Sequence, residues 1–212
     1  MIKRWLGACL LVPLFWFGAE PVSAQNALLG SDNGQDEPAT QILSNELTYD
    51  ESTQTSTFTG DVVMTRGLLK LLAQELVLRE DEQGYQFGTA TVGPEARVYI
   101  RQDRPENFEV LIGLGQRAEY DGQAETFELI GRARLTRYIC GKPFDTISGE
   151  RVRYFQKTDR YQAIAGPNSD NPDGRVRSIA QPRAKIDAAI AACRELEARG
   201  VEIPQPPEGP TL

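Results

Sequence analysis

The chain repeats part of itself at a fixed offset, and this constrains its fold more than any other feature. The repeated residues are Tyr49-Asp50, Gly60 and Thr65-Arg66, which recur 71 positions later as Tyr120-Asp121, Gly131 and Thr136-Arg137. Further along the chain the offset between matching residues changes: Glu75 matches Glu150, Tyr85-Gln86 matches Tyr161-Gln162, and Gly93-Pro94 matches Gly166-Pro167. Repeats of this size are typical of units that stack on copies of themselves. We therefore expect one continuous structure built from a doubled module.

Between Gln41 and Ala165 the pattern is that of β-strands. Apolar and polar residues alternate in short runs, and turn residues such as Arg66-Gly67 and Asp121-Gly122 interrupt them every 8 to 12 residues or so. This rhythm is typical of an all-β antiparallel sandwich or roll.

The clearest predicted strand runs from Thr126 to Ile139. Phe127, Leu129, Ala133 and Leu135 fall on one face, and Glu128, Arg132 and Arg134 fall on the other. Strand side chains alternate, so we expect an apolar row inside and a charged row in water. The repeat partner places Phe58, Val62 and Met64 inside, and the runs at 69–78 and 147–155 are expected to continue the same alternation. Gly60 and Gly131 interrupt their strands on the inward side, where a glycine would let the sheet curl.

The two ends of the chain differ from this β region. Lys3 and Arg4 precede an apolar run and a Val22-Ser23-Ala24 cleavage pattern, which predicts an export signal peptide at 1–24. Residues 25–40 are predicted to be a flexible lead-in, and 41–181 the β domain. Apolar residues at helical spacing predict an amphipathic helix at 182–200, followed by a Pro-rich tail at 201–212 that is either disordered or extended.

Charge and cysteine content narrow the function classes. The net charge is −7, which argues against nucleic acid as a partner, because phosphate binding needs a basic surface. Two cysteines follow the predicted signal, Cys140 and Cys193, and an oxidising export compartment would permit a disulfide. The sequence leaves their pairing open.

Catalytic chemistry has little support in the sequence. The chain has no histidine, which removes the usual general base and the commonest metal ligand, so we predict no enzyme activity, no metal site and no cofactor. Gly113-Leu114-Gly115 is only a fragment of a dinucleotide-binding motif, and we interpret it as a turn. Carboxylate pairs such as Asp50-Glu51 lie in predicted turns, where solvated charge is the better interpretation.

Four arginines could form a separate site. Arg132 and Arg134 point outward from one predicted strand, and Arg151 and Arg153 from a strand that could pair with it. One interpretation is a contact for an anion. We favour a solvated face whose charges are balanced by Glu128, Glu150 and Asp159.

With these patterns in hand, the chain resembles a known family. Phe58-Thr59-Gly60-Asp61-Val62, the stretch from Gly67 to Ala73, and Leu129 to Leu135 resemble the OstA-like domain of the LptA family of periplasmic lipopolysaccharide-transport proteins. The resemblance covers roughly residues 40–180. It implies a twisted β-jellyroll, open along one side, whose inner faces form an apolar trough.

The resemblance also implies a function and partners. The acyl chains of lipopolysaccharide (its lipid A part) would lie in the trough while sugars and phosphates stay in water. Copies would join head to tail as a homo-oligomer, bridging an LptC-like inner-membrane protein and an LptD-like outer-membrane translocon in the periplasm. The strands near 41–47 and 175–180 are the candidate joining edges. The helix and tail depart from the family pattern, and would either cover the C-terminal edge or swing away from it.

Inward parity then selects the residues expected to line the trough. They are Ile42, Phe58, Val62, Met64, Leu69, Leu71, Tyr120, Phe127, Leu129, Ala133, Leu135, Val152 and Tyr154. The alternative for each is an ordinary core position sealed from any ligand, because every sandwich needs such rows.

Two functions of other classes, and a second role within the same superfamily, remain in competition at this point. A jelly-roll carbohydrate-binding module would present exposed aromatic platforms, but both tryptophans, Trp5 and Trp16, lie in the predicted signal. A non-lipid periplasmic scaffold would have the same strands with a sealed core. An LptC-like protein would instead keep its N-terminal helix in the membrane.

Overall fold

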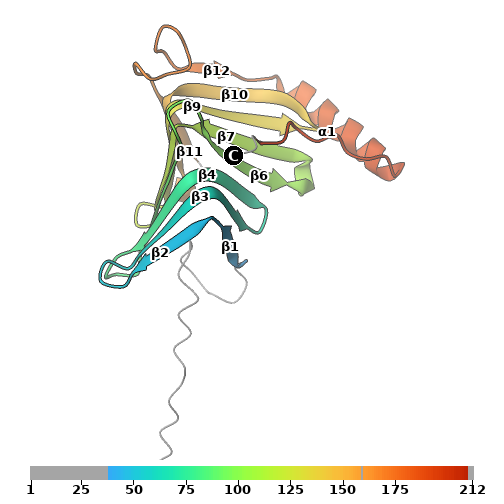
Figure 1. Cartoon of the computed structure of the whole chain (residues 1–212). Helices are drawn as coiled ribbons and strands as arrows, with labels where there is room; N and C mark the ends of the chain where they lie inside the picture. The colour runs from blue at the N-terminus through green and yellow to red at the C-terminus, as the bar shows by residue number, and fades with distance from the viewer. Residues whose placement is uncertain (1–37, 159, 210–212) are drawn as a thin grey trace, which may run out of the picture.

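The computed structural model describes residues 38–158 and 160–209. The predicted signal peptide and residues 25–37 of the predicted lead-in lie outside this range. The described chain is mainly antiparallel β-sheet, with one α-helix near its C-terminal end (Figure 1). The strands are β1 Thr40–Leu43, β2 Glu46–Asp50, β3 Thr55–Arg66, β4 Leu69–Glu80, β5 Gln86–Thr91, β6 Val98–Arg104, β7 Glu109–Gly115, β8 Arg117–Asp121, β9 Thr126–Ile139, β10 Lys142–Phe155, β11 Arg160–Ile164 and β12 Arg177–Ile179. Helix α1 spans Arg183–Ala198, and 3₁₀ turns lie at Pro105–Asn107 and Gln156–Thr158.

Four long strands, β3, β4, β9 and β10, divide this sheet into two leaves. The first half of β3 pairs with β2 and its second half with β1. In the same way β4 pairs with β6 and then β5, β9 with β8 and then β7, and β10 with β12 and then β11. Leaf I therefore contains β2, β5, β8 and β11, and leaf II contains β1, β6, β7 and β12. The inner faces of the leaves pack together in one apolar core, as expected for the predicted all-β jellyroll.

The bends that separate the leaves are the same in both modules. Gly60 and Asp61 both have positive φ (79° and 46°), as do Gly131 and Arg132 (70° and 50°). Opposite each bend an amide residue donates its backbone N–H to the glycine carbonyl: Asn45 to Gly60 at 3.0 Å and Gln116 to Gly131 at 2.9 Å. Asn45 and Gln116 are also 71 positions apart, so the predicted doubled module is present in three dimensions.

The bends correct one expectation about β4. At each bend two residues of one strand face one residue of its partner, as in a β-bulge, so the partner changes parity. In β4 the core residues are Leu71 and Ala73 before Gln74, and Leu76 and Leu78 after it. A single alternation through 69–78 is therefore wrong, and so is one through 147–155, because Ile147 and Val152 both pack in the core on either side of the second bend. The pairing registers also correct two details of the repeat. Gln74, rather than Glu75, is the counterpart of Glu150. Strands β5 and β11 are offset by 73 positions, so Tyr85 does not correspond to Tyr161.

Gly113-Leu114-Gly115 is not a turn, because it lies inside β7. Gly113 faces the core, where an added Cβ would come within 3.0 Å of Leu129 Cδ1. A glycine here allows β7 to approach Leu129 closely, which explains the motif without any phosphate-binding role.

The ends of the sheet are open edges. β1 and β2 form one edge, separated by Ser44-Asn45, and β11 and β12 form the other. The predicted edges at 41–47 and 175–180 thus hold only part of each, because β11 is also an edge strand.

The C-terminal segment is fastened away from these edges. The predicted helix is confirmed as α1, and Cys193 within it forms a disulfide with Cys140 in the β9–β10 turn (Cα–Cα 5.8 Å). All three residues of β12 remain exposed, so α1 neither covers that edge nor swings free. Residues 201–209 are extended and turn back toward β6 and β7 (Figure 1). Among the described residues, no helix has the length and hydropathy needed to cross a membrane.

A substitution at Gly131 tests whether the bend requires a glycine at this position. Gly131→Ala adds a Cβ at positive φ and forces it against the Gln116 side chain, so we expect a loss of about 2–3 kcal/mol in unfolding free energy, measured by urea denaturation. Gly84→Ala is the matched control, because Gly84 also has positive φ (84°) but has open space around it, and should cost only about 1 kcal/mol. Equal losses in the two variants would show that the contact with Gln116 contributes nothing.

Candidate functional site

A cavity of about 620 Å³ lies between the inner faces of the two leaves. Its lining is apolar in the middle, with leucine, isoleucine, valine and aromatic side chains contributed by both modules. The full lining is Met64, Arg66, Leu69, Leu71, Leu76, Leu78, Gly88, Ala90, Ile100, Gln102, Arg104, Leu111, Gly113, Ala118, Glu119, Tyr120, Glu125, Phe127, Leu129, Leu135, Val152, Tyr154, Gln156 and Tyr161. Because the leaves diverge from their bends, the cavity lies where the jellyroll is widest.

Most polar lining residues lie at or near the strand ends farthest from the bends, although Glu119 lies in the middle of β8. Arg66, at the end of β3, and Arg104, at the end of β6, belong to leaf II, and Gln156 follows the last strand residue of β10 in leaf I. Arg104 Nη1 lies 3.0 Å from Glu109 Oε1. Burial alone would lower the pKa of Arg104, but Glu109 and Tyr161 hold this pKa above its usual value. The cavity therefore has an apolar interior and a rim that keeps charge near water.

Nine of the thirteen predicted lining residues lie on this cavity. They are Met64, Leu69, Leu71, Tyr120, Phe127, Leu129, Leu135, Val152 and Tyr154. The other four, Ile42, Phe58, Val62 and Ala133, belong to the same inner apolar cluster but do not line the cavity. Val62 and Ala133 are fully buried close to the bends, where the leaves are nearest, and Ile42 lies at the open edge. Contact with a lipid remains a prediction for all thirteen.

Sequence reasoning missed several residues of the apolar lining. They are Leu76, Leu78, Ala90, Ile100, Leu111, Ala118 and Tyr161. Leu76 and Leu78 were missed because the bulge changes the parity of β4. Ala118 had an available signal, since it alternates with Tyr120 on the same short strand. Tyr161 stacks on the predicted residue Tyr154, with ring centroids 4.6 Å apart, a contact that depends on the β10–β11 register.

The four outward arginines face carboxylates. Arg153 Nη2 lies 2.9 Å from Glu128 Oε2, and Arg151 Nη1 lies 3.6 Å from Glu128 Oε1. Glu128 is only 6% exposed, so the expectation that it lies in water was wrong: the two guanidinium groups cover it.

Asp170 performs the same role for the other two. It lies 3.0 Å from Arg132 and 3.1 Å from Arg134, and it also pairs with Arg97 at 2.8 Å. Asp170 comes from the loop after β11, which crosses the outer face of the sheet. Charge balance by nearby carboxylates therefore accounts for this face, and Asp170 supplies the second carboxylate. Asp159 lies outside the described residues.

Comparison with known proteins places this geometry in a family. Residues 41–160 match the sequence model of the family described as LptA/(LptD N-terminal domain) LPS transport protein. The lipopolysaccharide export system protein LptH of Pseudomonas aeruginosa is 22% identical over 171 residues, which cover 80% of this chain and 93% of the relative.

A solved structure shows the same fold. The crystal structure of LptH, described as the LptA-homologous periplasmic component of the conserved lipopolysaccharide transport device of Pseudomonas aeruginosa, matches with a TM-score of 0.56 at 21% identity. The match covers 68% of this chain and 96% of that one. The family model ends at residue 160, so β12, α1 and the tail lie beyond it.

Proposed function

The chain belongs to the LptA/(LptD N-terminal domain) family of lipopolysaccharide-transport proteins, and on that premise we propose that it carries lipopolysaccharide across the periplasm. The acyl chains lie in the cavity between the leaves, and the sugars and phosphates stay outside, at the polar rim. The relative of known structure is described as a periplasmic component, which supports the same location for this protein.

The observation that carries this proposal is the apolar cavity inside an otherwise acidic protein. Transfer of acyl chains from water gains roughly 25 cal/mol for each Å² of apolar surface covered. The lining supplies that surface from both leaves, mostly through aliphatic and aromatic side chains. Lipid can therefore slide along the leaves without a chemical step, and the energy for directed movement must come from other components.

Neither competing function gains support. A carbohydrate-binding module needs an aromatic platform, but the large aromatic side chains that are exposed in the described part are Tyr49, on an edge strand, and Tyr85, in a distant turn. A scaffold with a sealed core does not account for a cavity of this size.

The open edges support a second part of the proposal, in which copies join head to tail. Within one chain the two modules meet through β5·β8 in leaf I and β6·β7 in leaf II. The module repeat makes β11 and β12 the counterparts of β5 and β6, and β2 and β1 the counterparts of β8 and β7. The C-terminal edge of one copy can therefore receive the N-terminal edge of the next through the joint already present inside the chain.

Strand direction agrees with this joint. β12 runs from the bends toward the rim, whereas β1 runs from the rim toward the bends, so the two would pair antiparallel. β11 and β2 are likewise opposed. Both leaves would then continue from copy to copy, with bend next to bend and cavity next to cavity.

The internal joint also fixes a register. Ile100 faces Gly113 within the chain, and the corresponding pair between copies is Ser178 with Ile42. Ala90 faces Ala118, which corresponds to Ala163 with Leu47. Leu47 is 56% exposed in the single chain and would be covered in the joint. The terminal copies would offer the same edges to an LptC-like inner-membrane protein and an LptD-like outer-membrane translocon.

A pair of phenylalanines tests the cavity. We expect a photoreactive phenylalanine analogue at Phe127, which lines the cavity, to capture lipopolysaccharide on irradiation in cells. Phe87 is the matched control, since its side chain lies under Arg79 and outside the cavity lining. Capture is read as a mass shift recognised by anti-lipopolysaccharide antibody. Equal capture at both positions, or at neither, would contradict lipid binding between the leaves.

The register has its own test. Chains carrying Ser178→Cys are mixed with chains carrying Ile42→Cys under mild oxidation, and we expect covalent dimers on non-reducing gels. Ile179→Cys with Ile42→Cys is the control, because a one-residue slip turns the side chains to opposite faces. Dimers that form equally well with Ile179→Cys would overturn the register, and no dimers with either pair would overturn the joint.

A further inference from the structure

Leaf II has a second apolar surface, on the face opposite the cavity. It consists of the buried residues Leu72, Tyr99, Val110 and Ile112, with Val63, Leu114 and Tyr138 packed against them; we call this the outer apolar cluster. Leu43, Val63, Leu72, Tyr99 and Leu114 follow one another as direct cross-strand partners from β1 to β7. At the β1 end of this row Leu43 is 58% exposed, whereas Leu72 and Tyr99 are nearly inaccessible.

The C-terminal segment covers this cluster. Pro204 lies against Gly141, where an added Cβ would come within 2.8 Å of the Pro204 carbonyl oxygen. Arg101 Nη2 donates to Gln205 Oε1 at 2.9 Å, and Gly209 packs against the Tyr99 ring and Leu72. Residues 183–209, which we call the strap, thus cross from the β9–β10 turn over leaf II.

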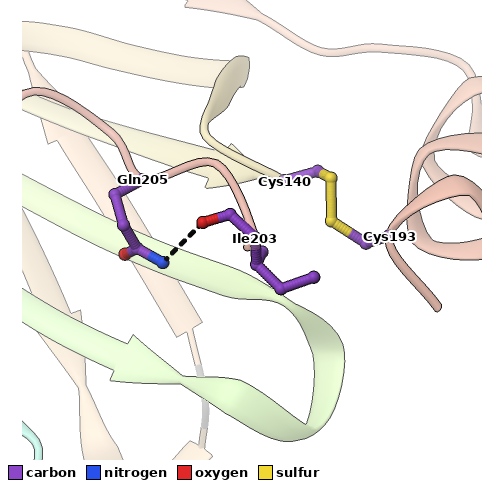
Figure 2. The surroundings of a disulfide bond; sticks show 4 residues. All are labelled: Cys140, Cys193, Ile203 and Gln205. Carbon is purple, nitrogen blue, oxygen red and sulfur yellow. Dashed lines mark hydrogen bonds between the residues drawn. A yellow bond between two sulfur atoms is a disulfide. The ribbon is translucent and has the colours of Figure 1, made fainter. Parts of the chain in front are cut away.

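Few residues of the strap are buried. Cys193 is the one buried residue of α1, and Pro206 is the one buried residue of the described tail. A helix of 16 residues with so little burial is marginal in water by itself. Figure 2 shows that the tail passes beside the Cys140–Cys193 bond at Ile203, whose carbonyl accepts from Gln205 Nε2 at 3.3 Å.

We propose that the outer apolar cluster is a docking surface whose occupant is the chain's own strap, and that the Cys140–Cys193 disulfide determines whether it is occupied. When the strap closes over the cluster, the two cysteine thiols lose two protons and two electrons to the disulfide of a thiol–disulfide exchange protein, which leaves as the dithiol. In opening, a dithiol reductant returns two electrons and two protons to the cysteines. The open chain exposes an apolar row that runs into the β1 edge, where it competes with ordered edge pairing.

A thiol placed under the strap tests this directly. Leu72→Cys, which would lie beneath Gly209, is labelled with a maleimide in the chain with its disulfide intact and in the Cys140→Ser/Cys193→Ser chain. We expect labelling at least about tenfold faster without the disulfide, because the strap then opens locally. Leu43→Cys, on the same row but uncovered, should label fast in both chains.

Two outcomes decide the proposal. If Leu72→Cys labels within about twofold in both chains, packing holds the strap and the proposal fails. If this substitution prevents folding, binding of a hydrophobic dye to the unsubstituted chain replaces it, since Cys140 and Cys193 are the cysteines present in the described part. Dye fluorescence should then rise on reduction, and an unchanged signal would overturn the proposal. Lipopolysaccharide capture at Phe127 reports the cavity between the leaves, away from the outer apolar cluster, so it separates this failure from failure of the proposed function.

Discussion

The fold depends on two pairs of left-handed residues, Gly60-Asp61 and Gly131-Arg132. Each pair lets a long strand leave one leaf and enter the other without ending its ladder, and each is closed by an amide residue that donates to the glycine carbonyl. Without these bends the strands would continue as one flat sheet, and their apolar rows would have no opposing face. The core, the cavity and the open edges all follow from repeating this bend once.

The bend also explains why one molecule can have a packed core and a cavity at once. Near the bends the leaves are close, and Val62 and Ala133 are fully buried between them. Farther away the leaves separate, and leucine and aromatic side chains line open space instead of meeting. At the rim the Arg104 guanidinium lies beside Glu109, which together with Tyr161 holds the pKa of Arg104 above its usual value. An amphiphile with apolar chains and an anionic head matches this change from an apolar interior to a polar rim.

Local patterns predicted much of this, and long-range pairing accounts for what they missed. The 71-residue repeat and the alternation within β3 and β9 can be recognised without knowing which strands pair. The fold class and nine lining residues could therefore be predicted. The role of Leu76 and Leu78 depends on a bulge, which shifts parity only once the partner strand is known. Asp170 pairs with arginines 36 or more positions away, and Cys193 with Cys140 at a separation of 53, so neither partner could be chosen from spacing.

The central claim is that acyl chains occupy the space between the leaves, and lipid recovered with the protein tests it most directly. The chain is purified from a lipopolysaccharide-producing periplasm without detergent, extracted, and analysed by mass spectrometry. We predict lipid A fragments with the unsubstituted chain and with Thr89→Asp, which lies outside the cavity lining, and their loss with Leu78→Asp, which places a charge among the lining side chains. Equal recovery from all three chains, or none from the unsubstituted chain, would contradict this account.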